Sequence, residues 1–177
     1  MVDDLIDRAR RTPTAGNSQG VEFLVLDHPD TVAAYWEATL SHETRSTFAF
    51  PGLLRAPLLV VPFGIPSRYL DRYSEADKVM TGLGSGEKSW SVPYWLVDAA
   101  FASMALQLLT VELGLGCCFF GMFTQETVVR ERFGIPDEAR AIGTIAIGYM
   151  DPDSERPGRS SRRARRPLAE VIHRGHW

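Results

Sequence analysis

The sequence predicts an α+β fold in which helices flank a mixed or antiparallel sheet. Four short apolar segments have the character of strands, and helical patterns of unequal length lie between them. This interleaving is typical of a domain built as layers of sheet and helix. The chain has 177 residues, 45% of them hydrophobic, and this length and composition favour one domain with a single core.

Runs of β-branched and aromatic residues between turn formers indicate the four strands. They are Val21–Leu26, Pro57–Gly64, Cys117–Phe120 and Ile142–Tyr149. Prolines stand near the ends of the second segment, which a strand tolerates where no ladder hydrogen bond is required.

Capping signals predict the shorter helices. Asp3 or Asp4 is expected to cap a first helix of about two turns, which ends before Pro13. A second helix is expected to open at Pro29-Asp30, and Thr124 is expected to cap a third.

The longest predicted helix runs from about Pro93 to Glu112, and Gly114 suits the left-handed position after its end. It is apolar on nearly every side, and such a helix has to be covered by a core or by a partner. Because few elements remain to cover it, we expect a dimer interface. Its polar residues Asp98 and Gln107 argue against a membrane span.

The loop from Pro13 to Gly20, called the amide loop below, is longer than a plain connection requires. Two of its side chains, Asn17 and Gln19, are carboxamides that both donate and accept hydrogen bonds. The loop is either an ordinary turn or a binding loop for a flat ligand with a polar edge.

Residues 66–92 are polar and harder to assign. Ser67–Met80 is compatible with a short helix, and Gly82–Gly86 is a flexible run. A segment of this length is either a linker or a lid over a binding site.

Several classes of function are disfavoured. The net charge of −3 argues against a general nucleic-acid binder, and the acidic start is unlike a secretory signal. Cys117 and Cys118 are adjacent, which suits neither a metal knuckle nor a redox motif. The pair His173 and His176 could seat a metal, but a frayed tail is the simpler interpretation. We therefore expect a cytoplasmic protein without a metal site.

Residues 151–177 are expected to be an arginine-rich extension that completes the domain formed by residues 1–150. The extension closes with an apolar segment, Pro167–Ile172, which is expected to clasp the domain. Its arginines form a solvated tail, a nucleic-acid patch or a phosphate clamp, and the lack of interleaved aromatic residues makes nucleic acid the weakest of the three. They are Arg156, Arg159, Arg162, Arg163, Arg165 and Arg166.

These parts together suggest a nucleotide-like cofactor such as a flavin. The amide loop would contact the edge of a ring, Cys117–Phe120 would form an apolar wall, and arginines would hold a phosphate. No nucleophile motif is present, and this also fits a flavin because the cofactor itself carries the electron chemistry.

The sequence resembles the FMN-dependent nitroreductase family over nearly its whole length. The resemblance rests on motifs that occur in the family's order. They are Arg11–Gln19 (R-x-P-S-x-x-N-x-Q), the helix from Asp98 that ends in Gly114-Leu115-Gly116, Phe120–Phe123, Phe133–Pro136, Ile145–Tyr149 and Arg165–Val171.

The resemblance implies a homodimer with two FMN sites, each built from both chains. NADPH or NADH would reduce the flavin, and a small electron acceptor such as a nitroaromatic or a quinone would reoxidise it. The N–H of Gly121 would lie near the reactive N5 of the ring and is the candidate catalytic group. The candidate FMN-binding residues are Pro13, Thr14, Ala15, Asn17, Gln19, Phe120, Gly121, Arg163 and Arg165.

Two features depart from the family pattern. Members usually begin with an arginine-rich element that binds the FMN phosphate, whereas this sequence starts at Met1, directly before the first predicted helix. Phe120 stands where some members place a glutamate. Either the C-terminal arginines suffice, or FMN binding is weak or absent. The alternative function is therefore a degenerate, non-catalytic flavin-binding member.

Overall fold

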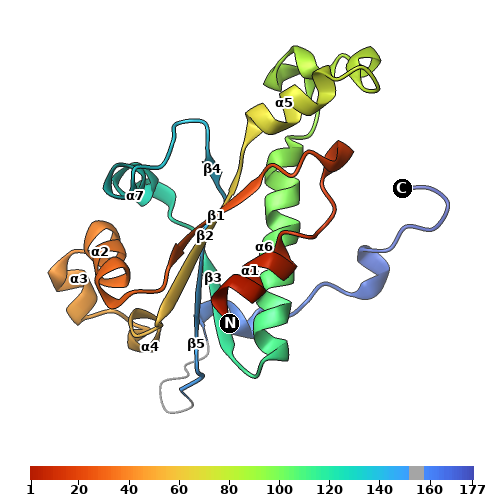
Figure 1. The fold of residues 1–177 in the computed structure, drawn as a ribbon. Coiled ribbons are helices and arrows are strands. Elements are labelled where there is room, and N and C mark those ends of the chain that lie inside the picture. The colour runs from red at the N-terminus through yellow and green to blue at the C-terminus, as the bar shows by residue number, and fades with distance from the viewer. Residues whose placement is uncertain (152–157) are drawn as a thin grey trace.

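The computed structural model describes residues 1–151 and 158–177. A sheet forms its centre, and helices cover both of its faces (Figure 1). The helices are α1 (Val2–Ala9), α2 (Pro29–Thr39), α3 (His42–Ser46), α4 (Pro51–Leu54), α5 (Pro66–Ser74), α6 (Tyr94–Glu112) and α7 (Glu126–Phe133). The strands are β1 (Val21–Leu26), β2 (Leu58–Gly64), β3 (Gly116–Phe120), β4 (Arg140–Ala141) and β5 (Thr144–Gly148).

Each pair of neighbouring strands in the sheet is antiparallel, in the order β1-β2-β5-β3, and the two-residue β4 also pairs with β2. The four predicted strands are confirmed, and β4 was not predicted because two residues leave no periodic pattern. The register places Val21 opposite Gly64 and Phe120 opposite Thr144. The start of β1 and the end of β3 therefore lie at the same end of the sheet but on opposite edges.

The central strand β2 is buried along its whole length, because helices cover the sheet on both sides. Its side chains alternate between the two faces, as strand geometry requires. Leu59 and Val61 pack with α2 and α7, whereas Leu58 and Val60 pack with α1 and α6. Burial on both faces explains why β2 has a continuous apolar sequence instead of an alternating one.

Helix α6 confirms the long predicted helix, and Gly114 follows it with a φ of 74°. By length and composition alone, α6 could cross a membrane, and 39% of that stretch is buried inside the protein. Trp95, Ala99 and Leu106 pack inward, so that α6 is the partly buried core helix of the domain. Its outward side is apolar too.

Two predicted helix starts were wrong. Met1 occupies the N-cap position of helix α1 and makes no side-chain cap, so that Asp3 and Asp4 lie in the first turn, where they complement the helix dipole. Helix α7 begins at Glu126, because a 3-10 turn occupies Phe123–Gln125 before it. Residues 41–47 have no apolar stripe, and they nevertheless contain α3. Ser41 caps the amino terminus of α3, because its hydroxyl accepts a hydrogen bond from the N–H of Thr44.

The segment 66–92 is a packed lobe beyond the end of the sheet (Figure 1). Helix α5 and three 3-10 turns surround the rings of Tyr69, Trp90 and Trp95. The indole N–H of Trp90 donates a hydrogen bond to the carbonyl of Leu83 at 2.9 Å. The lobe therefore has an aromatic core of its own and is not an extended linker.

Candidate functional site

The amide loop has an unusual backbone. Gly16, Asn17 and Gln19 have φ values of 61°, 57° and 51°. For residues with a side chain this left-handed conformation costs roughly 1–2 kcal/mol each, and asparagine tolerates it better than glutamine. Such conformations persist when surrounding contacts hold them, and they are frequent at ligand-binding sites.

A buried carboxylate holds the loop. Asp98 on α6 is only 2% exposed. Its Oδ2 accepts two hydrogen bonds of 2.8 Å, from the backbone N–H of Ala15 and from the hydroxyl of Tyr69. Burial, together with the hydrogen bond to Asp98, raises the pKa of Tyr69 far above its usual value. Tyr69 therefore remains a protonated donor toward Asp98 at neutral pH.

Arg72 on α5 holds the other side of the loop. Its Nε donates a hydrogen bond of 2.8 Å to the carbonyl of Gly16. Its other nitrogens bind both carboxylate oxygens of Asp77 at 2.7 Å. These hydrogen bonds lower the pKa of Asp77 to about 2. Asp77 is therefore ionised at neutral pH, and its carboxylate orients the guanidinium of Arg72 that binds the loop.

The loop satisfies its own backbone groups and leaves its carboxamides outside. The Oγ1 of Thr14 accepts the N–H of Gln19 at 3.0 Å, and the carbonyl of Thr14 accepts the N–H of Asn17 at 2.8 Å. The side chains of Asn17 and Gln19 are exposed. In the described part of the chain they make no hydrogen bond, so that their polar groups are available to a ligand.

The two glycines of the loop are required for packing on α5. A Cβ on Gly16 would lie 2.8 Å from Cε2 of Tyr73, and one on Gly20 would lie 2.4 Å from Cε2 of Tyr69. Their small size therefore serves the contact with these tyrosines.

The predicted apolar wall divides between the two faces of the sheet. Phe120 is half-buried, and its ring stacks on Trp36 with centroids 5.7 Å apart. Cys117 points toward α6, with its Sγ 3.8 Å from the carbonyl of Gln107, and Cys118 is exposed. Burial raises the pKa of both thiols. Gly121 follows β3 and is half-buried.

The predicted phosphate ligands Arg163 and Arg165 are exposed, and within the described ranges they form no ion pair. Arg166, by contrast, pairs with Glu170 at 3.4 Å. Arg156 lies outside the described residues. Every residue from 160 to 177 is exposed, including Leu168 in the predicted apolar clasp. The expectation that residues 151–177 complete the domain stays a prediction.

The structure of one chain does not bring the candidate residues together. The amide loop precedes β1, and Gly121 follows β3, at the two edges of the sheet. The two positions are separated by three strand spacings, or about 14 Å. The tail that carries Arg163 and Arg165 leaves the sheet at its other end, after β5 (Figure 1).

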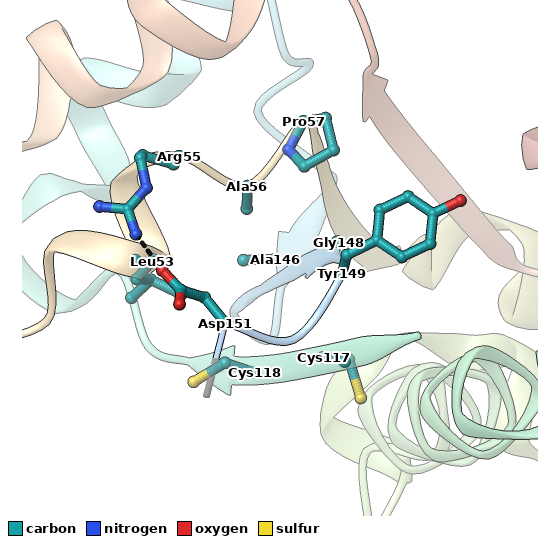
Figure 2. A pocket seen from close by; sticks show the side chains of 12 residues that line it. Leu53, Arg55, Ala56, Pro57, Cys117, Cys118, Ala146, Gly148, Tyr149 and Asp151 are labelled. Atoms are coloured by element: carbon teal, nitrogen blue, oxygen red, sulfur yellow. Dashed lines mark hydrogen bonds and ion pairs between the residues drawn. The ribbon is translucent and has the colours of Figure 1, made fainter. Parts of the chain in front are cut away.

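Figure 2 shows a cavity of about 360 Å³ at that other end. It lies between α4 and the ends of β3 and β5, and Arg55 pairs with Asp151 at 2.5 Å beside it. None of the candidate FMN-binding residues lines it, although Cys117 and Cys118 of the predicted apolar wall do. No local signal in the sequence indicated this ion pair, whose members are far apart in the chain.

Among the residues that the structure describes, no group of three or more metal-binding side chains is found. The ring of His173 stacks on Trp177, with centroids 4.1 Å apart. This contact occupies one face of one of the two histidines considered above as metal ligands.

The fold and the loop define a class of protein: an α+β domain with an antiparallel sheet, a long apolar helix on one face and a clamped carboxamide loop before the first strand. The chain belongs to the nitroreductase family, whose model matches residues 1–149. Comparison with curated proteins returns no match.

Several solved structures share the fold. A nitroreductase family protein from Clostridium difficile 630 is 23% identical, with a TM-score of 0.64 over 99% of this chain and 86% of that one. An FMN-dependent nitroreductase from Clostridium difficile R20291 is 20% identical, with a TM-score of 0.63 over 99% and 87%. The Bacillus subtilis protein ydfN is 16% identical, with a TM-score of 0.72 over 97% and 86%.

The residues at hand fit FMN in their chemistry. Exposed carboxamides suit the polar edge of a flavin ring, and exposed guanidinium groups that lack an ion pair within the described residues suit a phosphate. Sequence reasoning missed the residues that hold the loop, namely Asp98, Tyr69 and Arg72. The one available signal was an acidic residue, Asp98, in an otherwise apolar helix.

Proposed function

We propose that this protein is an FMN-dependent oxidoreductase that uses NADPH or NADH to reduce small electrophiles such as nitroaromatics or quinones. Membership of the nitroreductase family supports this proposal. The observation that carries it is the amide loop, which is held in a left-handed conformation with Asn17 and Gln19 facing outward. An ordinary turn would not need a buried carboxylate to hold it.

Each group has a distinct role in this proposal. Asn17 and Gln19 bind the polar edge of the ring, Pro13, Thr14 and Ala15 shape the surface beside it, and Phe120 lies against the ring. The N–H of Gly121 donates a hydrogen bond near N5 of the flavin ring, where negative charge develops. Arg163 and Arg165 bind the phosphate. When bound, FMN supplies the two-electron chemistry that these side chains lack.

We propose that the working molecule is a homodimer with each site shared between two copies. The amide loop and Gly121 stand about 14 Å apart on opposite sheet edges, so that loop and glycine of different copies are the better candidates for one site. The outward side of α6 offers the interface, through Phe101, Met104, Leu108 and Val111, which are 54–63% exposed. We place the protein in the cytoplasm, and we keep the proposal that residues 151–177 are an arginine-rich extension that completes the domain.

The absorbance spectrum of freshly purified protein, with and without added FMN, tests the proposal. We expect a protein-bound flavin spectrum that NADPH or NADH bleaches in the absence of oxygen, and that a quinone then restores. Bound flavin that no nicotinamide reduces would indicate the non-catalytic alternative. If excess FMN gives no bound flavin, the proposal is wrong.

A further inference from the structure

We infer that Asp98 is a positioning residue for the cofactor, because its carboxylate fixes the amide loop in the conformation that presents Asn17 and Gln19 to a flavin. This inference rests on the proposed function. Asp98 lies 83 residues from Ala15 in the chain and belongs to a different element, yet it accepts the N–H of Ala15 at 2.8 Å. In the described part of the chain, no hydrogen bond joins it to the side chain of Asn17 or Gln19.

The hydrogen bonds around the carboxylate of Asp98 suit a role in fixing the amide loop. The carboxylate is almost fully buried, and a buried charge is tolerated when hydrogen bonds compensate it. Its two donors, Ala15 and Tyr69, reach the same oxygen. One donor belongs to the loop and the other to α5. Asp98 therefore joins three elements, α6, α5 and the amide loop, at one atom.

The loop needs this support because its backbone is unfavourable on its own. Three of its residues have positive φ, and two of these carry side chains. Without an external contact, the loop would populate other conformations, and only the fraction in the competent conformation would bind. The apparent dissociation constant rises as that fraction falls.

The opposite side of the loop is held by Arg72, which is itself fixed by Asp77. Loss of Asp98 therefore leaves the loop attached at one side only. The hydroxyl of Tyr69 donates to Asp98 and not to the loop backbone, so its removal leaves the hydrogen bond between Ala15 and Asp98 in place. We expect Tyr69→Phe to have a smaller effect than Asp98→Ala.

The experiment combines hydrogen exchange of the flavin-free protein with flavin affinity. Asp98→Ala should expose the amide of Ala15 to exchange and raise the dissociation constant of FMN about tenfold or more, since the lost bonds involve a charge. Asp98→Asn keeps a carbonyl oxygen that can accept the N–H of Ala15. Unlike Asp98→Ala, it should therefore retain most of the affinity for FMN and most of the protection of the Ala15 amide from exchange.

Thr110→Val is the matched control. Thr110 is buried on the same helix, and among the described residues its hydroxyl bonds only to the carbonyl of Leu106. This variant should lower the stability of α6 without changing exchange in the amide loop or the affinity for FMN. If Thr110→Val and Asp98→Ala weaken FMN binding equally, the effect is general destabilisation and the inference is wrong.

The two proposals fail in distinguishable ways. If the wild-type protein binds FMN and Asp98→Ala binds it equally well, the inference about Asp98 is overturned and the proposed function stands. If the wild-type protein binds no FMN, the proposed function is refuted, and the positioning of a flavin falls with it. Hydrogen exchange then still shows whether Asp98 fixes the loop.

Discussion

Shortening Leu108 to alanine tests whether the outward side of α6 is a subunit interface. Leu108 is 63% exposed in the single chain. Full burial of a leucine side chain contributes about 1.5–3 kcal/mol, so a partner that covers the exposed part gains about 1–2 kcal/mol. The residue occurs twice in a twofold contact, and Leu108→Ala should therefore cost the dimer about 2–4 kcal/mol. This raises the dissociation constant about 30- to 700-fold.

Sedimentation equilibrium of the wild-type and variant proteins measures this change. Because Leu108 is exposed in the monomer, the free energy of unfolding of the monomer should change by less than about 0.5 kcal/mol. Val128→Ala is the control, since Val128 is 43% exposed on α7, on the other side of the sheet. An unchanged dimer in Leu108→Ala, or a wild-type protein that stays monomeric, would refute this assignment of the interface.

Three further variants test other parts of the site and the core. Asn17→Ala should weaken FMN binding by about 1–3 kcal/mol, because a group on the ring edge loses its partner; unchanged affinity in a fluorescence titration would exclude Asn17 from the site. Arg165→Ala should raise the dissociation constant of FMN about tenfold or more, and leave that of riboflavin unchanged, because only FMN carries a phosphate; equal effects on both would remove Arg165 from the phosphate site. Burial raises the pKa of Tyr35 from 10.0 to about 12. Between these two values the unfolded chain binds fewer protons than the folded one, so the free energy of unfolding falls as the pH rises, by about 3 kcal/mol in total. Tyr35→Phe should remove this part of the fall in urea unfolding across that window, and an unchanged slope would contradict it.

Prediction from sequence succeeded where local patterns are strong. The four strands are short apolar runs between turn formers, and α6 has nineteen helical residues followed by a left-handed glycine. Prediction was less accurate at helix starts such as those of α1 and α7. There a cap depends on which neighbouring backbone groups are satisfied, and several candidate residues lie within one turn.

The sequence predicted the ligand-binding side chains of the candidate site, but not the residues that hold them in place. The carboxamides of Asn17 and Gln19 are visible in the sequence as unusual residues for a connection. Their presentation depends on Asp98 and Arg72, which belong to α6 and α5. Contacts between residues so far apart leave no periodic signal in a single sequence.

The sequence alone determined the class of fold, the family and the identity of the groups that a ligand could meet, because strand and helix periodicity and the ordered motifs are local properties. Only the tertiary structure decided how those groups are arranged. The sheet order separates the amide loop from Gly121, and packing of α5 on α6 places a buried carboxylate under the loop. The physical reason is that hydrogen bonds and packing contacts form between groups that lie close together in space, whatever their separation along the chain.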